Sequence, residues 1–283
     1  MYVLKPSRSQ KNVMKNIIFD LDGVLYLGKT KIVGASSSVT KLQNYKLNTF
    51  FLTNNSTLDR QKIKEKLKSF KINAQISQIM CSSYATAHYI QKLNKNARVY
   101  VIGEDGLKKE LTNAKLKVLD ENDCKKTLAD FLVVGLDRKF NYEKLEIAQK
   151  HIIANKKFIA TNTDPQYPSH EGIKPGGGAM VKAVCATSSR SKNPDFVVGK
   201  PSAYMLKLLL GSKNAQDYIL VGDRLDSDIM LANKMNMHSI LVLSGITKKE
   251  DLKKSKIKPN AVLNSVKDLP NYIKSVFNQI NHL

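Results

Sequence analysis

The stretch that decides the fold is NIIFDLDGVL, at residues 16–25. The apolar run of residues 17–19 predicts a short buried strand, which ends abruptly in two carboxylates and a glycine. Because side chains alternate along an extended chain, Asp20 and Asp22 begin on the same side, and Gly23 lets the backbone turn tightly after them. Ligands of an open parallel sheet bind beyond the carboxyl ends of its strands, where two acids can attract a divalent cation and divide nucleophile and acid/base duties. When this motif is considered without the rest of the chain, an ordinary acidic turn after a strand is the alternative interpretation.

The composition is that of a globular protein with one large or two modest domains. The chain has 283 residues, of which 42% are hydrophobic and 25% are charged. Its apolar runs are shorter than the ~20 residues that a membrane-spanning helix needs, so no membrane partner is expected. The cysteines, Cys81, Cys124 and Cys185, are odd in number and lack C-x-x-C spacing, which predicts a cytoplasmic protein without a disulfide framework or zinc site. Met14 stands directly before the first strand, so residues 1–13 are a candidate for a dispensable extension.

The formal net charge of +22 allows two interpretations. Clustered lysines and arginines would neutralise the phosphates of a nucleic acid. Here the lysines are spread over nearly every polar segment, and none of the usual nucleic-acid-binding motifs is present. We therefore favour solvated helix faces that steer anionic substrates, and a nucleic-acid partner is not expected.

A second strand is predicted at residues 48–52, and a polar cluster, TNNST, follows it at residues 53–57. A Lys-rich amphipathic helix begins near Asp59. Hydroxyl and amide groups in front of a helix N-terminus form a ready anion cradle, although such residues also cap helices. Both roles can hold at once, with Thr53 and Asn54 facing the ligand and later residues capping the helix.

A second α/β pattern runs from about residue 83 to residue 190. Strands are predicted at residues 98–102, 131–134 and 158–160, with helical segments between them. The pattern closes with a turn-rich loop, Asn162–Pro168, and a triple glycine at residues 176–178. The glycines match neither the P-loop nor the dinucleotide fingerprint, so we interpret them as loop architecture.

The first pattern then resumes with an apolar run at residues 196–199, followed by Lys200. A buried strand at residues 218–222 ends in DRLDSD, which places three acids within residues 223–228. Three acids are costly to hold together unless a cation or a basic group neutralises them, although acids also favour helix N-termini. Two further strands, at 239–243 and 261–263, and a closing helix at 266–280 complete the predicted elements.

Four clusters at predicted strand ends resemble, in chain order, the four signature motifs of the haloacid dehalogenase superfamily. They are DLDG at 20–23, TNNS at 53–56, GKP at 199–201 and GDRLDSD at 222–228. The closer resemblance is to the p-nitrophenyl phosphatase branch, which includes phosphoglycolate, pyridoxal phosphate and ribonucleotide monophosphate phosphatases. It implies an α/β fold in which a doubly wound, parallel-sheet core of residues 1–83 and 191–283 is interrupted by an α/β cap domain of residues 84–190.

The resemblance also implies roles for the acids. Asp20 would be the nucleophile that takes the phosphoryl group as an aspartyl-phosphate, and Asp22 the general acid/base. Mg²⁺ would be held by Asp20, the backbone carbonyl of Asp22 and Asp223, with Asp228 supporting these ligands from behind.

The remaining site residues surround the phosphoryl group in this interpretation. Thr53 and Asn54 would bind its oxygens with Asn55 beside them, and Lys200 would neutralise charge on phosphate and nucleophile. Asp164, in the cap loop, is the candidate for the contact that selects the substrate.

The expected function is Mg²⁺-dependent hydrolysis of a small phosphorylated metabolite. The substrate stays open between phosphoglycolate, pyridoxal phosphate, a nucleotide and a sugar phosphate. The alternatives are a non-catalytic binding or regulatory protein that kept the fold, and a basic nucleic-acid-binding protein. A homodimer through the cap is a further expectation from the resemblance.

Overall fold

The computed structural model describes residues 15–188 and 192–276. Three expectations therefore fall partly outside the described residues: the extension of residues 1–13, the domain boundary at residues 190 and 191, and the end of the closing helix beyond residue 276. Two parallel sheets with helices on their faces dominate the described part of the chain. This confirms the predicted α/β class.

The core sheet has six parallel strands within the described residues, in the order β15-β14-β13-β1-β4-β5. The strands are β1 (Asn16–Phe19), β4 (Asn48–Thr53), β5 (Ile79–Cys81), β13 (Tyr218–Gly222), β14 (His238–Val242) and β15 (Ala261–Leu263). The chain starts in the middle, winds out to β5 and then returns to the other side of β1, which is the doubly wound topology. The strand order reverses between β1 and β13, and a ligand site is expected at their carboxyl ends.

Helices cover both faces of the core sheet because its strands are apolar on both sides. One face packs against α2 (Ala35–Asn44), α3 (Arg60–Ser69) and α12 (Leu269–Val276), which follows the short η4 (Val266–Asp268). The other face packs against α4 (Ser82–Leu93), α9 (Tyr204–Leu210) and α10 (Met230–Lys234). The remaining core elements are η1 (Ile76–Gln78), η2 (Ala215–Asp217), η3 (Leu225–Ile229) and α11 (Lys249–Lys254).

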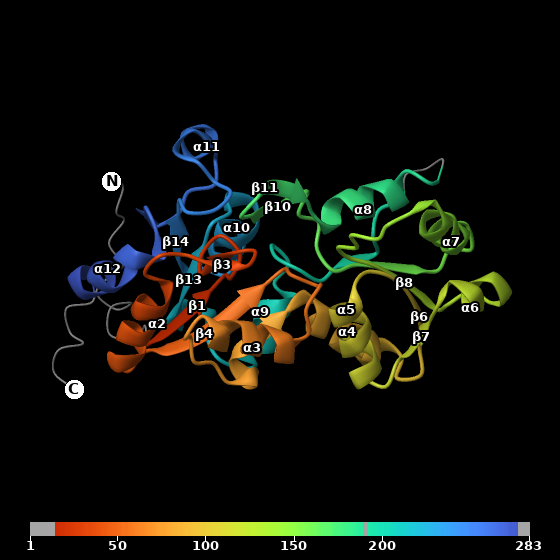
Figure 1. Cartoon of the computed structure of the whole chain (residues 1–283), viewed down its shortest axis with the longest axis horizontal. Helices are drawn as coiled ribbons and strands as arrows, with labels where there is room; N and C mark the ends of the chain where they lie inside the picture. Colours follow the sequence, from red (N-terminus) through yellow and green to blue (C-terminus); the bar gives the residue numbers. More distant parts are fainter. Residues whose placement is uncertain (1–14, 189–191, 277–283) are drawn as a thin grey trace.

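A second parallel sheet forms the cap, and its described strands run in the order β12-β9-β8-β6-β7. They are β6 (Arg98–Ile102), β7 (Lys117–Leu119), β8 (Phe131–Val134), β9 (Lys157–Ala160) and β12 (Phe196–Val197). One face packs against α6 (Glu121–Lys126), α7 (Tyr142–Ile153) and α8 (Gly177–Cys185), and the other packs against α4 and α5 (Asp105–Asn113). Figure 1 shows the two sheets side by side, with β1, β4, β13 and β14 in one half of the molecule and β6, β7 and β8 in the other.

One strand lies in a different sheet from the one that the sequence analysis expects. The sequence pattern places the apolar run at residues 196–199 in the core, whereas β12 pairs with β9 at the edge of the cap sheet. The physical reason is the residue before it: Asp195 donates its N–H to the carbonyl of Phe158 and accepts the N–H of Phe158 on Oδ2, both at 2.7 Å. The chain then returns to the core at Lys200.

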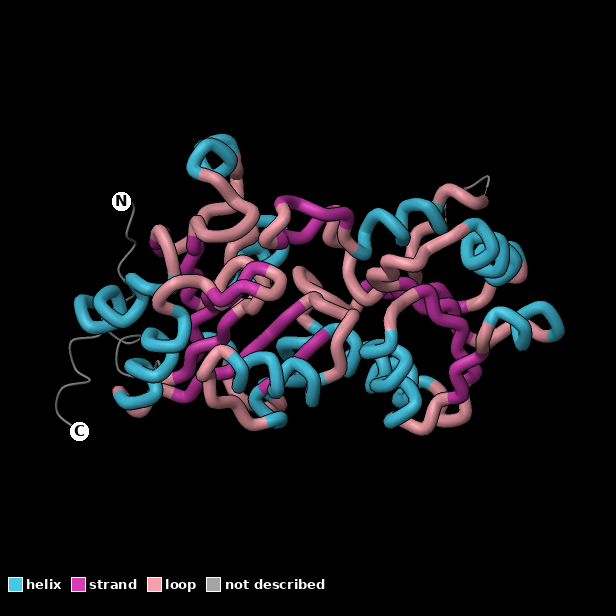
Figure 2. Tube along the Cα trace, in the orientation of Figure 1, coloured by secondary structure: helices cyan, strands magenta, loops and turns pink. Residues whose placement is uncertain are grey.

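Two antiparallel hairpins meet between core and cap. They are β2–β3 (Tyr26–Leu27 and Thr30–Lys31) in the core and β10–β11 (Gln166–Ser169 and Gly172–Pro175) in the cap. Figure 2 shows the cap hairpin reaching toward the core. Its first strand is tied there, because Arg224 donates a hydrogen bond from Nη1 to the carbonyl of Gln166 at 3.2 Å. In the described ranges, no helix combines the length and the apolar character needed to cross a membrane.

Candidate active site

Asp20 begins the site directly after β1. This residue is 6% exposed, and its backbone N–H donates to the carbonyl of Val221 at 2.8 Å, which fixes it against β13. The chain then turns at Gly23, whose φ of 89° is strained for any residue with a side chain. A Cβ at Gly23 would also lie 2.3 Å from Oδ2 of Asp223. The glycine therefore lets this turn approach the acid that follows β13, and leaves Asp22 half-buried at the same edge.

Lys200 connects the first and last acids. Its ammonium donates to Oδ1 of Asp20 and to Oδ1 of Asp228, each at 2.6 Å, and to the carbonyl of Leu52 at 3.1 Å. All three side chains are almost completely buried, so the ion pairs are shielded from water. Burial alone would lower the pKa of Lys200, but the carboxylates of Asp20 and Asp228 outweigh it and raise that pKa.

Three carboxyl groups come together at the carboxyl ends of β1 and β13. One oxygen from each of Asp20, Asp223 and Asp228 lies within 4.8 Å of the others. Burial raises the pKa of Asp20 well above its usual range, and the neighbouring acids add to that increase while Lys200 opposes it. Burial and the charge of Asp228 likewise raise the pKa of Asp223 to about 7. The cluster carries more negative charge than one lysine offsets.

Asp223 shows where a cation fits this cluster. Its Oδ2 accepts the backbone N–H of Ile246 at 2.7 Å, and its backbone carbonyl accepts the N–H of Thr247 at 3.2 Å. Its Oδ1 is buried and, among the described residues, has no hydrogen-bond partner. A buried carboxylate oxygen without a donor is costly unless a cation binds it. The all-oxygen donor set of this cluster suits a hard divalent cation.

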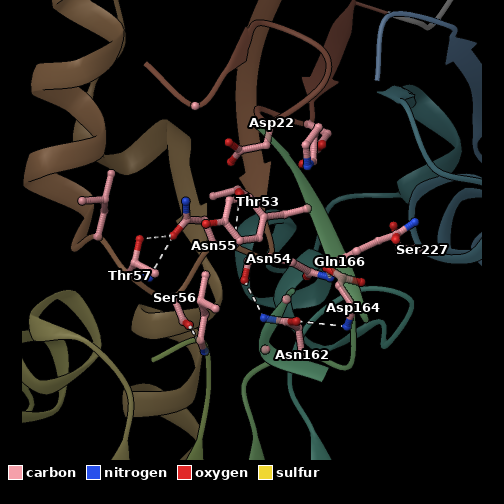
Figure 3. A pocket seen from close by; sticks show the side chains of 18 of the residues that line it. Asp22, Thr53, Asn54, Asn55, Ser56, Thr57, Asn162, Asp164, Gln166 and Ser227 are labelled. Carbon is pink, nitrogen blue, oxygen red and sulfur yellow. Dashed lines mark hydrogen bonds between the residues drawn. The ribbon is translucent and has the colours of Figure 1, made fainter. Parts of the chain in front are cut away.

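The polar cluster after β4 forms a tight loop over the site, and Figure 3 shows Asp22 next to Thr53 and Asn55. Oγ1 of Thr53 accepts the backbone N–H of Asn55 at 3.0 Å. Oδ1 of Asn55 in turn accepts the N–H and the hydroxyl of Thr57, both at 2.8 Å. Asp59 caps α3 by accepting the N–H groups of Gln61 and Lys62. Asp59 therefore caps the helix, while Thr53 and Asn55 use their side-chain oxygens to shape the loop before it.

The side chain of Asn54 holds other site residues in place. Its Oδ1 accepts the backbone N–H of Lys200 at 2.7 Å, and its Nδ2 donates to the carbonyl of Lys200 at 3.1 Å. Nδ2 also donates to Oδ2 of Asp164 in the cap, at 2.9 Å. The backbone carbonyl of Asn54 accepts hydrogen bonds from Ser82 and from Asn162. Asn54 therefore connects the core, the cap and Lys200.

The predicted residues line one cavity of about 350 Å³ between core and cap. This volume is at the lower end of the range for small-molecule sites. The predicted site residues in the wall of this cavity are Asp20, Asp22, Thr53, Asn54, Asn55, Asp164, Lys200 and Asp223. Asp228 lies behind the wall, fully buried against Lys200. Burial raises the pKa of Asp22, an effect that Lys66, Asn55 and Lys200 oppose.

The cavity also contains residues that the sequence analysis missed. Arg224 lies next to Asp223 and binds the exposed carboxylate of Asp226 through Nε and Nη2, at 3.1 and 2.9 Å. Lys66 comes from α3, and Arg138 comes from the loop after β8. Arg224 lies inside a recognised motif and could have been noticed there. Lys66 and Arg138 carried no local signal, because basic residues are common throughout this sequence.

Comparisons with known proteins agree with this geometry. Residues 17–117 match the family model of haloacid dehalogenase-like hydrolases, and residues 197–269 match one described as HAD-hydrolase-like. The acid sugar phosphatase of Staphylococcus epidermidis is 36% identical over 255 residues, covering 89% of this chain and 94% of that protein. The 5'-nucleotidase YutF of Bacillus subtilis is 34% identical over 262 residues, covering 92% of this chain and 98% of that protein.

Solved structures give the same result. The p-nitrophenyl phosphatase from Archaeoglobus fulgidus superposes with a TM-score of 0.82 at 34% identity, over 92% of this chain and 99% of that chain. The 4-nitrophenylphosphatase from Thermotoga maritima superposes with a TM-score of 0.83 at 30% identity, over 93% of this chain and 99% of that chain. The resemblance seen in the sequence is thus confirmed. The chain belongs to the haloacid dehalogenase-like hydrolase family, as a phosphatase of its p-nitrophenyl phosphatase branch.

Proposed function

We propose that this phosphatase hydrolyses a small phosphomonoester through an aspartyl-phosphate on Asp20, with Mg²⁺ as its cofactor. The observation that carries the proposal is the arrangement of Asp20, Asp223 and Asp228 around Lys200 at the bottom of the cavity. An anionic carboxylate approaches a dianionic phosphate only when cations offset their repulsion. Phosphoryl transfer then depends mostly on positioning and electrostatic stabilisation.

Asp20 is the proposed nucleophile because it lies at the strand switch point and in the cavity wall. Lys200 holds one of its oxygens at 2.6 Å, which orients the carboxylate and opposes its protonation. A carboxylate oxygen of Asp20 attacks phosphorus, the bond to the ester oxygen breaks, and the phosphoryl group stays on Asp20. Water then attacks the phosphorus of this acyl phosphate and releases inorganic phosphate.

Asp22 is the proposed general acid and base. It is half-buried in the cavity wall, two residues from the nucleophile, and its carboxyl can reach the leaving oxygen. In the first half-reaction Asp22 gives its proton to that oxygen. In the second, the resulting carboxylate takes a proton from the attacking water. One residue therefore serves both halves of the reaction.

Mg²⁺ fits the carboxylate cluster because of the buried, unpaired Oδ1 of Asp223 and the all-oxygen donor set. We propose that Asp20, the backbone carbonyl of Asp22 and Asp223 hold it, with Asp228 bracing the cluster through Lys200. When bound, the cation offsets the negative charge of nucleophile and phosphate. Thr53, Asn55 and the backbone around Asn54 are proposed to bind the phosphoryl oxygens, since they line the same cavity.

The deciding experiment compares wild type with Asp20→Asn on p-nitrophenyl phosphate, with and without Mg²⁺. Turnover that needs the metal and disappears in the variant is the expected result. Asp226→Asn is the matched control, because its carboxylate is exposed and outside the cluster. Full activity in Asp20→Asn, or metal-independent turnover by the wild type, would contradict the proposal.

The substrate is proposed to be a sugar phosphate, a nucleotide, phosphoglycolate or pyridoxal phosphate. Two relatives are named for sugar phosphates and for nucleotides, and the cavity volume of about 350 Å³ suits small molecules. A panel of these esters, ranked by kcat/KM, would identify the class. We also propose a cap that begins near residue 84 and extends to residue 199, because β12 belongs to its sheet, together with a cytoplasmic location and a homodimer through the cap. Size-exclusion chromatography with light scattering tests the last of these.

A further inference from the structure

Lys66 places a half-buried ammonium group in the wall of the catalytic cavity. It lies on α3, and its Nζ is 3.6 Å from the centroid of the Tyr26 ring, which is itself 1% exposed. Burial lowers the pKa of Lys66, and the charge of Asp22 opposes that change. The aromatic face holds the ammonium in a fixed position beside the proposed general acid.

The other cationic groups of the cavity are already paired or solvated. Lys200 binds two carboxylates, and Arg138 and Arg224 each form an ion pair with a neighbouring acid. Lys29 is exposed to water. Within residues 15–188 and 192–276, the ammonium of Lys66 forms neither an ion pair nor a hydrogen bond, and it lies over the ring of Tyr26. Among the described residues of the cavity wall, its ammonium is therefore the partly desolvated cation that is available to bind a ligand.

The position of Lys66 indicates which part of a ligand it would meet. Asp22 forms a backbone bridge with Tyr26, the residue whose ring lies under the Lys66 ammonium, and both Asp22 and Lys66 line the same cavity. Asp22 protonates the leaving oxygen in the proposed mechanism, so Lys66 lies on the leaving-group side of the phosphorus. An anion bound there would replace the water that burial removes from the ammonium.

We propose that Lys66 binds an anionic group on the leaving part of the substrate. The enzyme then prefers phosphomonoesters that carry a carboxylate or a second phosphate within a few bonds of the ester oxygen. Both groups supply the negative charge and the acceptor oxygens that an ammonium binds. This inference rests on the proposed function, because it takes the side of Asp22 as the leaving-group side.

The test uses pairs of esters that differ only in the second charge. The first pair is 2-phosphoglycolate and 2-hydroxyethyl phosphate, and the second is propane-1,3-diol bisphosphate and 3-hydroxypropyl phosphate. For the wild type, kcat/KM of at least one charged ester should exceed that of its neutral partner about tenfold or more, mainly through KM. Lys66→Met should remove most of this ratio, and Lys66→Arg should keep it. Lys68→Met, an exposed lysine of the same helix, should leave the ratio unchanged.

The outcomes separate this inference from the proposed function. A preference in only one pair identifies the anion as a carboxylate or a phosphate and supports the proposal. Equal losses on charged and neutral esters in Lys66→Met would assign the lysine to positioning Asp22, and would overturn the proposal. So would equal rates of the wild type on both members of each pair, a result that does not depend on any variant's folding. A wild type that turns over no ester at all, p-nitrophenyl phosphate included, would instead contradict the proposed function.

Discussion

Asn54 and Asp164 join the core to the cap through a hydrogen bond of 2.9 Å, although they are 110 residues apart in the chain. The same Asn54 side chain holds both the N–H and the carbonyl of Lys200. The position of Lys200 is thus connected to the position of the cap. These contacts give Asn54 and Asp164 different roles, which substitutions can separate.

Asn54→Ala should lower kcat on every substrate by a similar factor. It leaves the buried N–H of Lys200 without its acceptor, and a lost partner of this kind costs roughly 1–3 kcal/mol. We expect a loss of about 10- to 100-fold on p-nitrophenyl phosphate and on a sugar phosphate alike. Asn96→Ala, at an exposed asparagine outside the site, is the control. Losses that differ strongly between substrates would show that Asn54 selects the substrate instead.

Asp164→Ala should alter the order of substrates more than it alters turnover of p-nitrophenyl phosphate. Asp164 lines the cavity from the cap side, and burial raises the pKa of its carboxyl while Arg224 opposes that effect. Its removal changes the shape and charge that a leaving group meets. The measurement is kcat/KM over a panel of phosphomonoesters. An equal loss on all of them, or no change on any, would count against a role in specificity.

Mg²⁺ should raise the thermal stability of the wild type, because the carboxylate cluster that we propose to bind it exists only in the folded state. At a concentration one hundred times its Kd, a ligand stabilises the folded state by about 3 kcal/mol. Differential scanning fluorimetry with Mg²⁺ and with EDTA measures the shift in Tm. Asp223→Asn should lose most of the shift, and Asp226→Asn should keep it. A shift that survives in Asp223→Asn would place the cation elsewhere.

Much of the fold and site could be predicted from the sequence because their signals are local. Apolar runs that end in polar clusters predicted the strands β1, β4 and β13, and they also predicted the acids that follow β1 and β13 as site residues. In a parallel sheet the carboxyl ends of strands lie at one edge, so separate clusters had to converge. The short strands β5 and β7 were not predicted, since each has three residues and no clear periodicity.

What the sequence did not show depends on contacts between distant segments. β12 joins the cap sheet through the pairing of Asp195 with Phe158, which no local pattern indicates. Lys66 is one of several lysines on α3, and only the packing of that helix against Tyr26 brings its ammonium into the cavity. The side chain of Asn54 was predicted to face phosphate, whereas its hydrogen bonds connect Lys200 with the cap.

Stability should fall on acidification through a histidine far from the catalytic site. His238 begins β14, is 4% exposed, and its Nε2 lies 2.9 Å from the hydroxyl of Tyr272 on α12. Burial lowers the pKa of His238 to about 4, below the value of about 6.5 for the unfolded chain. Between these pH values the unfolded state binds more protons than the folded state. The contribution of His238 to the free energy of unfolding is therefore complete above pH 6.5 and decreases as the pH falls toward 4.

The expected loss from this one residue is roughly 2 kcal/mol between pH 7 and pH 5. Urea unfolding at both pH values measures it, with Mg²⁺ held constant. His238→Gln cannot titrate there, so its stability should decrease by about 2 kcal/mol less than that of the wild type over the same interval. His170→Gln, at an exposed histidine of the cap hairpin, should follow the wild type. If His238→Gln loses as much stability between pH 7 and pH 5 as the wild type does, a group other than His238 controls the acid sensitivity. Removing the buried imidazole would then not have changed how many more protons the unfolded state binds than the folded state.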